Sequence, residues 1–149
     1  MKAIRLIALA ACMAATLDAS AQEQEIRLFS HRGGRMEHDE NTLSAFQASY
    51  DAGYRGFETD IRMTRDGALV ITHDSSLERT TDGTGTVEEK TEAEIRQLAT
   101  KQGNKMMFLD ELLEFLKGKE GLYVEFEMKT HPAALYPEER LARYCDELY

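Results

Sequence analysis

The sequence predicts an α/β fold, a TIM-type (β/α)8 barrel of which the 149 residues cover only roughly the N-terminal half. Short apolar segments with strand character alternate with amphipathic helical segments, which is typical of a parallel sheet with helices outside it. Two of the predicted strands carry acidic side chains on one face, which is unusual for a buried barrel strand. A complete barrel of this kind needs about 250 residues. In these 149 residues we therefore expect open strand edges and an uncovered apolar face. We expect these 149 residues by themselves to be inactive or insoluble.

The N-terminal residues 1–21 have the pattern of a signal peptide. Lys2 and Arg5 form a basic start, residues 6–17 form an apolar run, and an Ala-Ser-Ala cleavage pattern precedes Gln22. The apolar run is too short to cross a membrane, so no transmembrane segment is predicted. The pattern predicts secretion or export to the periplasm.

A second reading of the same segment is lipoprotein anchoring at Cys12, because the residues before Cys12 resemble a lipobox. The apolar run continues past Cys12, which favours cleavage after Ala21 instead. Residues 22–149 then form the domain. The formal net charge of -9 disfavours nucleic acid as a partner, because binding to its phosphates depends on Lys and Arg.

Hydrophobic periodicity, helix caps and glycine stops define the elements expected in residues 22–149. A capping box formed by Thr91 and Glu94, for example, marks a helix start. The expected strands are residues 26–30, 56–64, 68–72 and 122–130. The expected helices begin near residues 42, 91, 109 and 137 and end near residues 53, 99, 118 and 149.

Charged side chains line one face of two expected strands. They are Glu58, Asp60 and Arg62 on the first strand, and Glu125, Glu127 and Lys129 on the second. Buried carboxylates are costly unless they are paired or bound to a cation. One such strand would favour a solvated edge strand, but two acidic strands favour a shared cation site. Oxygen ligands alone favour a hard divalent cation, Mg²⁺ or Ca²⁺.

Two histidines, His31 and His73, each end an extended run. Histidine titrates near neutral pH, so a pair across a site can act as general acid and base. A structural role for both histidines is the alternative. His38 and His131 are expected in loops, and no role is predicted for them.

Arg32 directly follows His31, and Lys129 lies on the same predicted strand face as Glu127. Their cationic side chains are suited to contact an anionic phosphate oxygen. The alternative is a salt bridge, for instance between Lys129 and Glu127. A metal site, two histidines and phosphate-binding cations at a barrel mouth together suit cleavage of a phosphoester.

The order of motifs along residues 28–130 resembles the glycerophosphodiester phosphodiesterase family. The shared motifs are His31-Arg32-Gly33, Glu40-Asn41-Thr42, Ala45-Phe46, Gly53, Glu58-Thr59-Asp60, Thr64-x-Asp66-Gly67, Val70-x-x-His73-Asp74, Leu77-x-Arg79-Thr80-Thr81, Gly83-Thr84-Gly85 and Glu127-Met128-Lys129. Asp39 stands where the family usually has proline, and Met107-Phe108-Leu109 replaces its usual Pro-Thr-Leu.

The resemblance implies a role for each candidate residue. It implies metal ligation by Glu58, Asp60 and Glu127, general acid/base catalysis by His31 and His73, and phosphate contacts from Arg32 and Lys129. It implies metal-dependent hydrolysis of a small glycerophosphodiester to sn-glycerol 3-phosphate and an alcohol. The alternatives are a related phosphodiesterase acting on lysophospholipids, and a truncated, non-catalytic secreted fragment.

Overall fold

The computed structural model describes residues 27–148. The predicted signal peptide, Cys12 and the first residues of the predicted domain lie outside the described residues. Among the described helices, none has both the length and the apolar composition that a membrane crossing requires.

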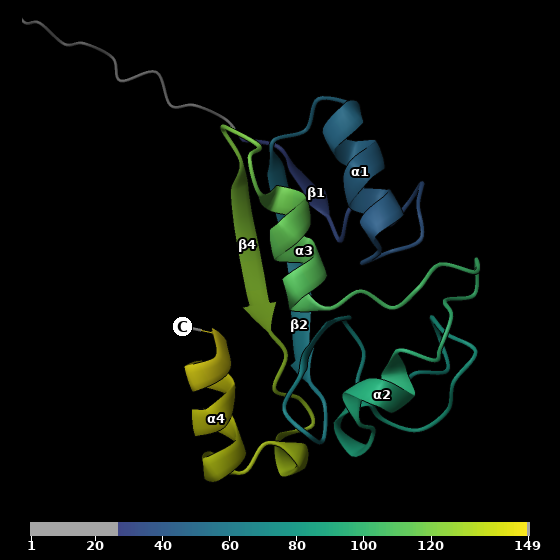
Figure 1. The fold of residues 1–149 in the computed structure, drawn as a ribbon, viewed down its shortest axis with the longest axis vertical. Coiled ribbons are helices and arrows are strands. Elements are labelled where there is room, and N and C mark those ends of the chain that lie inside the picture. Colours follow the sequence, from purple (N-terminus) through teal and green to yellow (C-terminus); the bar gives the residue numbers. More distant parts are fainter. Residues whose placement is uncertain (1–26, 149) are drawn as a thin grey trace, which may run out of the picture.

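The structure is built on a sheet whose central strand is β2, Gly56–Met63 (Figure 1). The parallel strands β1, Phe29–His31, and β4, Tyr123–Met128, lie on opposite edges of β2. Both pairings confirm the predicted parallel sheet. Because parallel strands end at the same edge of a sheet, the carboxyl ends of β1, β2 and β4 meet.

The strand β3, Leu69–Ile71, corrects the expectation of a wholly parallel sheet. It pairs antiparallel to the end of β2, with Ile61 opposite Ile71 and Met63 opposite Leu69. A turn at Asp66-Gly67 connects the two strands, and a connection this short joins only antiparallel neighbours. His73 therefore follows a hairpin strand, and its position is not equivalent to that of His31.

The predicted helices are present, with the cap signals that were read from the sequence. The Thr42 hydroxyl accepts the Ala45 N–H at the start of the first helix, and the Thr91–Glu94 capping box starts the second. The helices are α1 Leu43–Asp51, α2 Glu92–Ile95, α3 Leu109–Leu116 and α4 Glu138–Leu148, with two 3-10 turns, η1 Val87–Glu89 and η2 Ala133–Leu135. The second helix is shorter than the predicted run to residue 99.

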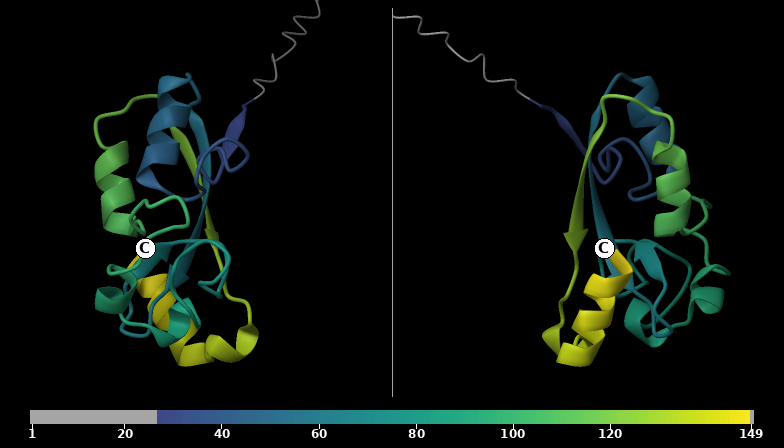
Figure 2. Two further views of the ribbon diagram at one scale, coloured as in Figure 1. Left: turned by 90° about the vertical axis from the view of Figure 1, so that its right-hand side faces the viewer. Right: turned by 60° about the vertical axis from the view of Figure 1, so that its left-hand side comes forward.

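The main core lies between one face of the sheet and three helices, α1, α3 and α4 (Figure 2). The odd-numbered side chains of β2 point into it, as the strand period requires. The fully or nearly buried members are Phe46, Phe57, Ile61, Met63, Leu69, Ile71, Met107, Leu112, Phe115, Tyr136 and Tyr144. The even-numbered residues of β2 therefore occupy the opposite face, which in a complete barrel is the interior.

A second, smaller core supports the long connection between β3 and α3. It consists of Val70, Leu77, Val87, Ile95, Met106 and Phe108. This packing gives a defined shape to the connection, which includes η1 and α2.

The chain beyond His31 turns sharply toward α1 through Gly33. The φ of Gly33 is +76°, and a Cβ atom at this position would lie 2.9 Å from the Cβ of Ala45. Only glycine combines this conformation with so close an approach, so Gly33 sets the path from β1 to the helix.

Candidate functional site

Strand register brings the predicted acidic residues together at the carboxyl ends of the strands. His31 lies opposite Glu58, and Asp60 lies opposite Glu127. One carboxylate oxygen from each of Glu58, Asp60 and Glu127 lies within 4.8 Å of the others. Three carboxylates this close could hold a metal ion, and their mutual repulsion favours a bound cation.

Asp60 is the most enclosed member of this acidic cluster, with a side chain that is 1% exposed. Its Oδ2 accepts a hydrogen bond from Asn41 Nδ2 (3.0 Å) and lies 3.1 Å from Arg32 Nε. Its Oδ1 lies 3.1 Å from Lys129 Nζ but makes no hydrogen bond. A buried carboxylate oxygen without a hydrogen bond is costly, and coordination to a divalent cation would satisfy it.

Lys129 and Arg32 form ion pairs with the cluster in this structure. Lys129 Nζ lies 2.5 Å from Glu127 Oε1 and 3.1 Å from Asp60 Oδ1, which is the salt bridge considered as the alternative for Lys129. Arg32 contacts Asp60 and also donates to Glu40 Oε1 (3.2 Å). Both cations therefore lie beside the carboxylates and partly neutralise their charge.

The backbone at Arg32 adopts a left-handed conformation, with a φ of 54°, that is uncommon for a non-glycine residue. This conformation lets the Arg32 N–H reach both the carbonyl (3.0 Å) and the Oε2 (3.1 Å) of Glu58. Such local strain persists where the surroundings hold it in place and is common at functional sites.

Glu58 and His31 form the outer side of the cluster. The His31 Nε2 lies 3.6 Å from Glu58 Oε2, and the His31 side chain is half exposed. Burial and the nearby charge of Asp60 raise the pKa of Glu58 above its ordinary value. A bound cation would offset both effects by stabilising the ionised carboxylate.

His73 is oriented by its neighbour Asp74. The His73 Nδ1 lies 2.6 Å from Asp74 Oδ1, and an ionised carboxylate can only accept a hydrogen bond. The proton of this bond therefore belongs to Nδ1, which leaves Nε2 available for proton transfer. Asp74 in turn accepts a hydrogen bond from Arg79 Nε.

Arg79 links His73 and Asp74 to Arg32, which lies beside the acidic cluster. Its guanidinium contacts both oxygens of Glu40, at 2.7 and 3.0 Å, and Glu40 accepts a hydrogen bond from Arg32. The hydrogen bond from Arg79 is the main cause that lowers the pKa of Glu40. A continuous chain of charged contacts thus runs from His73 to Arg32.

Ionisation of Asp74 should make the free energy of unfolding depend on pH in the acidic range. Burial opposes its ionisation, but hydrogen bonds from Arg79 and His73 outweigh burial and lower its pKa from 3.8 to about 2. The stabilisation by ionised Asp74 is therefore complete above the pKa that Asp74 has in the unfolded chain, and it is lost as the pH falls toward 2. Between about pH 5 and pH 3 we expect wild type to lose on the order of 1 kcal/mol more stability than Asp74→Asn. Urea unfolding at both pH values measures this difference, and parallel losses in the two proteins would contradict it.

A cavity of about 720 Å³ opens beside this site. His73 and its following residues line one wall, and Glu127, Lys129 and the segment to Pro132 line the other. The predicted proton-transfer group and phosphate-binding group thus face a common space large enough for a small ligand.

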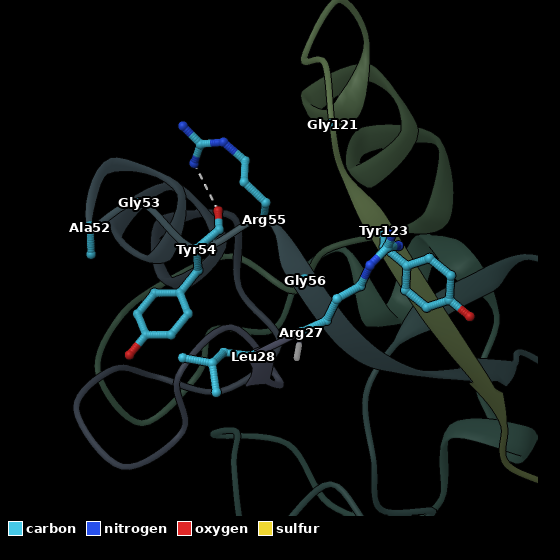
Figure 3. Close-up of a pocket in the computed structure, with 9 residues that line it drawn as sticks. All are labelled: Arg27, Leu28, Ala52, Gly53, Tyr54, Arg55, Gly56, Gly121 and Tyr123. Carbon is cyan, nitrogen blue, oxygen red and sulfur yellow. Dashed lines mark hydrogen bonds between the residues drawn. The ribbon is translucent and has the colours of Figure 1, made fainter. Parts of the chain in front are cut away.

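A second cavity, of about 460 Å³, lies at the amino ends of β2 and β4 (Figure 3). Arg55 at this cavity donates to the carbonyls of Tyr50 and Tyr54, and its guanidinium stacks on the Tyr50 ring. The cavity is at the opposite end of β2 from Asp60, so it belongs to a different region from the acidic cluster.

Several residues of the site had no predicted role. They are Glu40, Asn41, Arg62, Asp74, Arg79 and Glu88. All but Arg62 and Glu88 belong to motifs recognised in the sequence. Their polar side chains in those motifs could have indicated a role in the site. Glu88 carried no signal, because its partners are distant in the chain.

Comparisons with known proteins agree with this geometry. The profile of the glycerophosphoryl diester phosphodiesterase family matches residues 31–146. The chain belongs to this family. The match covers every element from the end of β1 into α4 and includes all of the candidate site residues.

Named glycerophosphodiester phosphodiesterases are among the relatives of this family member. A protein of Caldanaerobacter subterraneus is 35% identical over 129 residues, covering 80% of this chain and 52% of that protein. Human glycerophosphodiester phosphodiesterase 1 is 35% identical over 114 residues, covering 71% of this chain and 34% of that protein. The chain thus spans about half or less of the length of these relatives.

Solved structures of the family show the same partial overlap. A phosphodiesterase of Oleispira antarctica, solved with the product sn-glycerol-3-phosphate, is 30% identical with a TM-score of 0.70. The match covers 83% of this chain and 51% of that chain. A glycerophosphodiester phosphodiesterase of Agrobacterium tumefaciens has a TM-score of 0.66 at 29% identity, covering 83% of this chain and 63% of that one. The described residues therefore form part of the family's barrel.

Proposed function

We propose that the protein hydrolyses glycerophosphodiesters to sn-glycerol 3-phosphate and an alcohol, with a divalent cation at Glu58, Asp60 and Glu127. The observation that supports this most is the convergence of these three carboxylates within 4.8 Å, beside a cavity lined by His73 and Lys129. The Oleispira antarctica relative, solved with sn-glycerol-3-phosphate, suggests the product.

The bound cation would neutralise phosphate charge and align the substrate. The acidic ligands and their hard oxygen atoms fit Mg²⁺ or Ca²⁺. The same cation would neutralise the carboxylates that Lys129 now contacts. The ammonium of Lys129 would then be free to contact a phosphate oxygen. Arg32, held by Glu40 and by its own backbone, directs its guanidinium toward the same region.

The two histidines supply proton transfer. One imidazole accepts a proton from the attacking water as the water oxygen bonds to phosphorus. The other donates a proton to the alcohol oxygen as the phosphorus–oxygen bond to the leaving alcohol breaks. Asp74 fixes the tautomer of His73 for this task, since it holds the Nδ1 proton and leaves Nε2 facing the reaction.

Release of glycerol 3-phosphate from glycerophosphocholine by the complete gene product tests the proposal. We expect turnover that a chelator abolishes and that added Mg²⁺ or Ca²⁺ restores. A parallel assay with lysophosphatidylcholine tests the lysophospholipid alternative. No turnover of any glycerophosphodiester, with either metal, would refute the proposal and support a non-catalytic fragment.

We also propose that residues 1–21 direct the chain to the periplasm or the exterior and are then removed. The basic start, the apolar run and the cleavage pattern support this. Mass spectrometry of the exported protein should find Gln22 at the N-terminus, and a lipid on Cys12 would contradict this expectation.

A further inference from the structure

A buried ion pair lies on the same face of β2 as the acidic cluster but outside it. Arg62 Nη1 lies 2.7 Å from Glu88 Oε1, and the two side chains are 6% and 1% exposed. Burying two charges costs free energy that their attraction often fails to recover. A buried pair beside a site therefore calls for a reason other than stability.

The remaining contacts of Arg62 join the two walls of the cavity. Its Nε donates to the carbonyl of His73 and its Nη1 to the carbonyl of His131, both at 2.8 Å. His73 begins one wall, and His131 lies two residues after Lys129 on the other. Because a guanidinium is planar and its N–H groups diverge at fixed angles, these contacts fix the spacing between the walls.

Glu88 makes the same connection with its own oxygens. Its Oε2 accepts a hydrogen bond from the Ser75 hydroxyl (2.6 Å), and its Oε1 accepts one from the Tyr136 hydroxyl (2.7 Å). Ser75 belongs to the wall that carries His73, and Tyr136 follows the wall that carries His131. Arg62 is thus hydrogen-bonded to both walls, and Glu88 is bonded to one wall and to the segment that follows the other.

These hydrogen bonds also keep the pair charged. Burial opposes ionisation of Glu88, but the bonds from Ser75, Tyr136 and Arg62 outweigh it and hold the pKa of Glu88 below its ordinary value. Burial and the bond to Glu88 raise the pKa of Tyr136, so its hydroxyl remains a donor. The network is therefore fully formed at neutral pH.

We propose that this Arg62–Glu88 network, formed by Arg62, Glu88, Ser75 and Tyr136, positions His73 relative to Lys129 for the proposed hydrolysis. It is a positioning network, and none of its members is required to touch the substrate. The main chain of Lys129 is separately fixed by its bond to the carbonyl of Ile61 (2.9 Å). The main chain before His73 is anchored in the same way by the bond of the Thr72 N–H to the carbonyl of Asp60 (3.0 Å). Loss of the network should consequently displace the wall segments that follow these two anchors.

The kinetic test uses Arg62→Lys in the complete gene product, with Arg65→Lys as the matched control. The control changes an exposed arginine two residues after the end of β2, paired with Glu94 at 3.6 Å. We expect Arg62→Lys to lower kcat about 10- to 100-fold and to change KM less than about 3-fold, because misplacement of a reacting group lowers kcat. The control should retain wild-type values.

A double-mutant cycle separates positioning from a general structural effect. If Arg62 acts through His73, adding Arg62→Lys to His73→Asn should cause no further loss of kcat. A loss that multiplies with that of His73→Asn would overturn the proposal. Tyr136→Phe serves where Arg62→Lys fails to fold, since it removes only the hydroxyl and leaves the ring to stack on Tyr144. It should lower kcat in the same direction, by several-fold.

Amide hydrogen exchange tests the positioning without an activity readout. In Arg62→Lys, exchange should become faster in residues 73–76 and 130–133 and stay unchanged in the pairing of β2 with β4. Unchanged exchange in both wall segments would overturn the positioning role. Absence of any wild-type turnover would instead refute the proposed function, and the exchange result would show separately whether the network orders the walls.

Discussion

Glu58→Gln is expected to abolish the release of glycerol 3-phosphate from glycerophosphocholine. The substitution keeps the size of the side chain but removes one of the three negative charges that converge within 4.8 Å. Loss of partners outside the ligand set already costs about 10- to 100-fold in metal affinity or activity. Loss of a ligand charge should therefore lower activity at least about 100-fold.

The fall in activity should accompany weaker binding of the metal itself. Calorimetric titration of the metal-free protein with Mg²⁺ and Ca²⁺ measures this without substrate. Glu125→Gln is the matched control. Glu125 lies on the same face of β4 as Glu127 and directly opposite Glu58, but its side chain is exposed and does not belong to the acidic cluster. Wild-type activity or metal affinity in Glu58→Gln would refute the metal assignment.

His73→Asn is expected to have the second largest effect. General acid/base catalysis contributes about 10²- to 10⁴-fold, so kcat should fall within that range while KM changes little. Asparagine preserves a polar side chain that can still contact Asp74, so the fold should be retained. Steady-state kinetics and thermal unfolding of the same samples measure both consequences.

His38→Asn is the control for this prediction. His38 is an exposed loop histidine, and none of the contacts described for the candidate site involves its ring. Equal losses in the two variants would show that a general effect of histidine replacement, rather than proton transfer by His73, lowers the activity. An unaffected kcat in His73→Asn would remove His73 from the mechanism.

The predictions share one structural cause. The parallel register of β1, β2 and β4 places one histidine and three carboxylates in adjacent rows at the carboxyl end of the sheet. The hairpin to β3 then returns the chain so that His73 reaches the same end. The site is therefore shared between barrel strands and a connection that is not part of the barrel.

The sequence by itself determined the elements, the family and the residues of the acidic cluster. Local signals suffice for these, because a side-chain period of two assigns strand faces and caps such as Thr42 and Thr91 fix helix starts. Ordered motifs spread along most of the chain identify the family without any knowledge of contacts. The acidic face of β2 and that of β4 were predicted in the same way.

Only the tertiary structure decided how these elements and charges are paired. The direction of β3, the ion pair of Lys129 with Asp60, and the Arg62–Glu88 network depend on contacts between residues that are distant in sequence or on strand order. Pairing direction and register follow from turn geometry and from which faces are buried together, and no single segment carries that information. Arg62 and Glu88, 26 positions apart, become partners only when the fold encloses both.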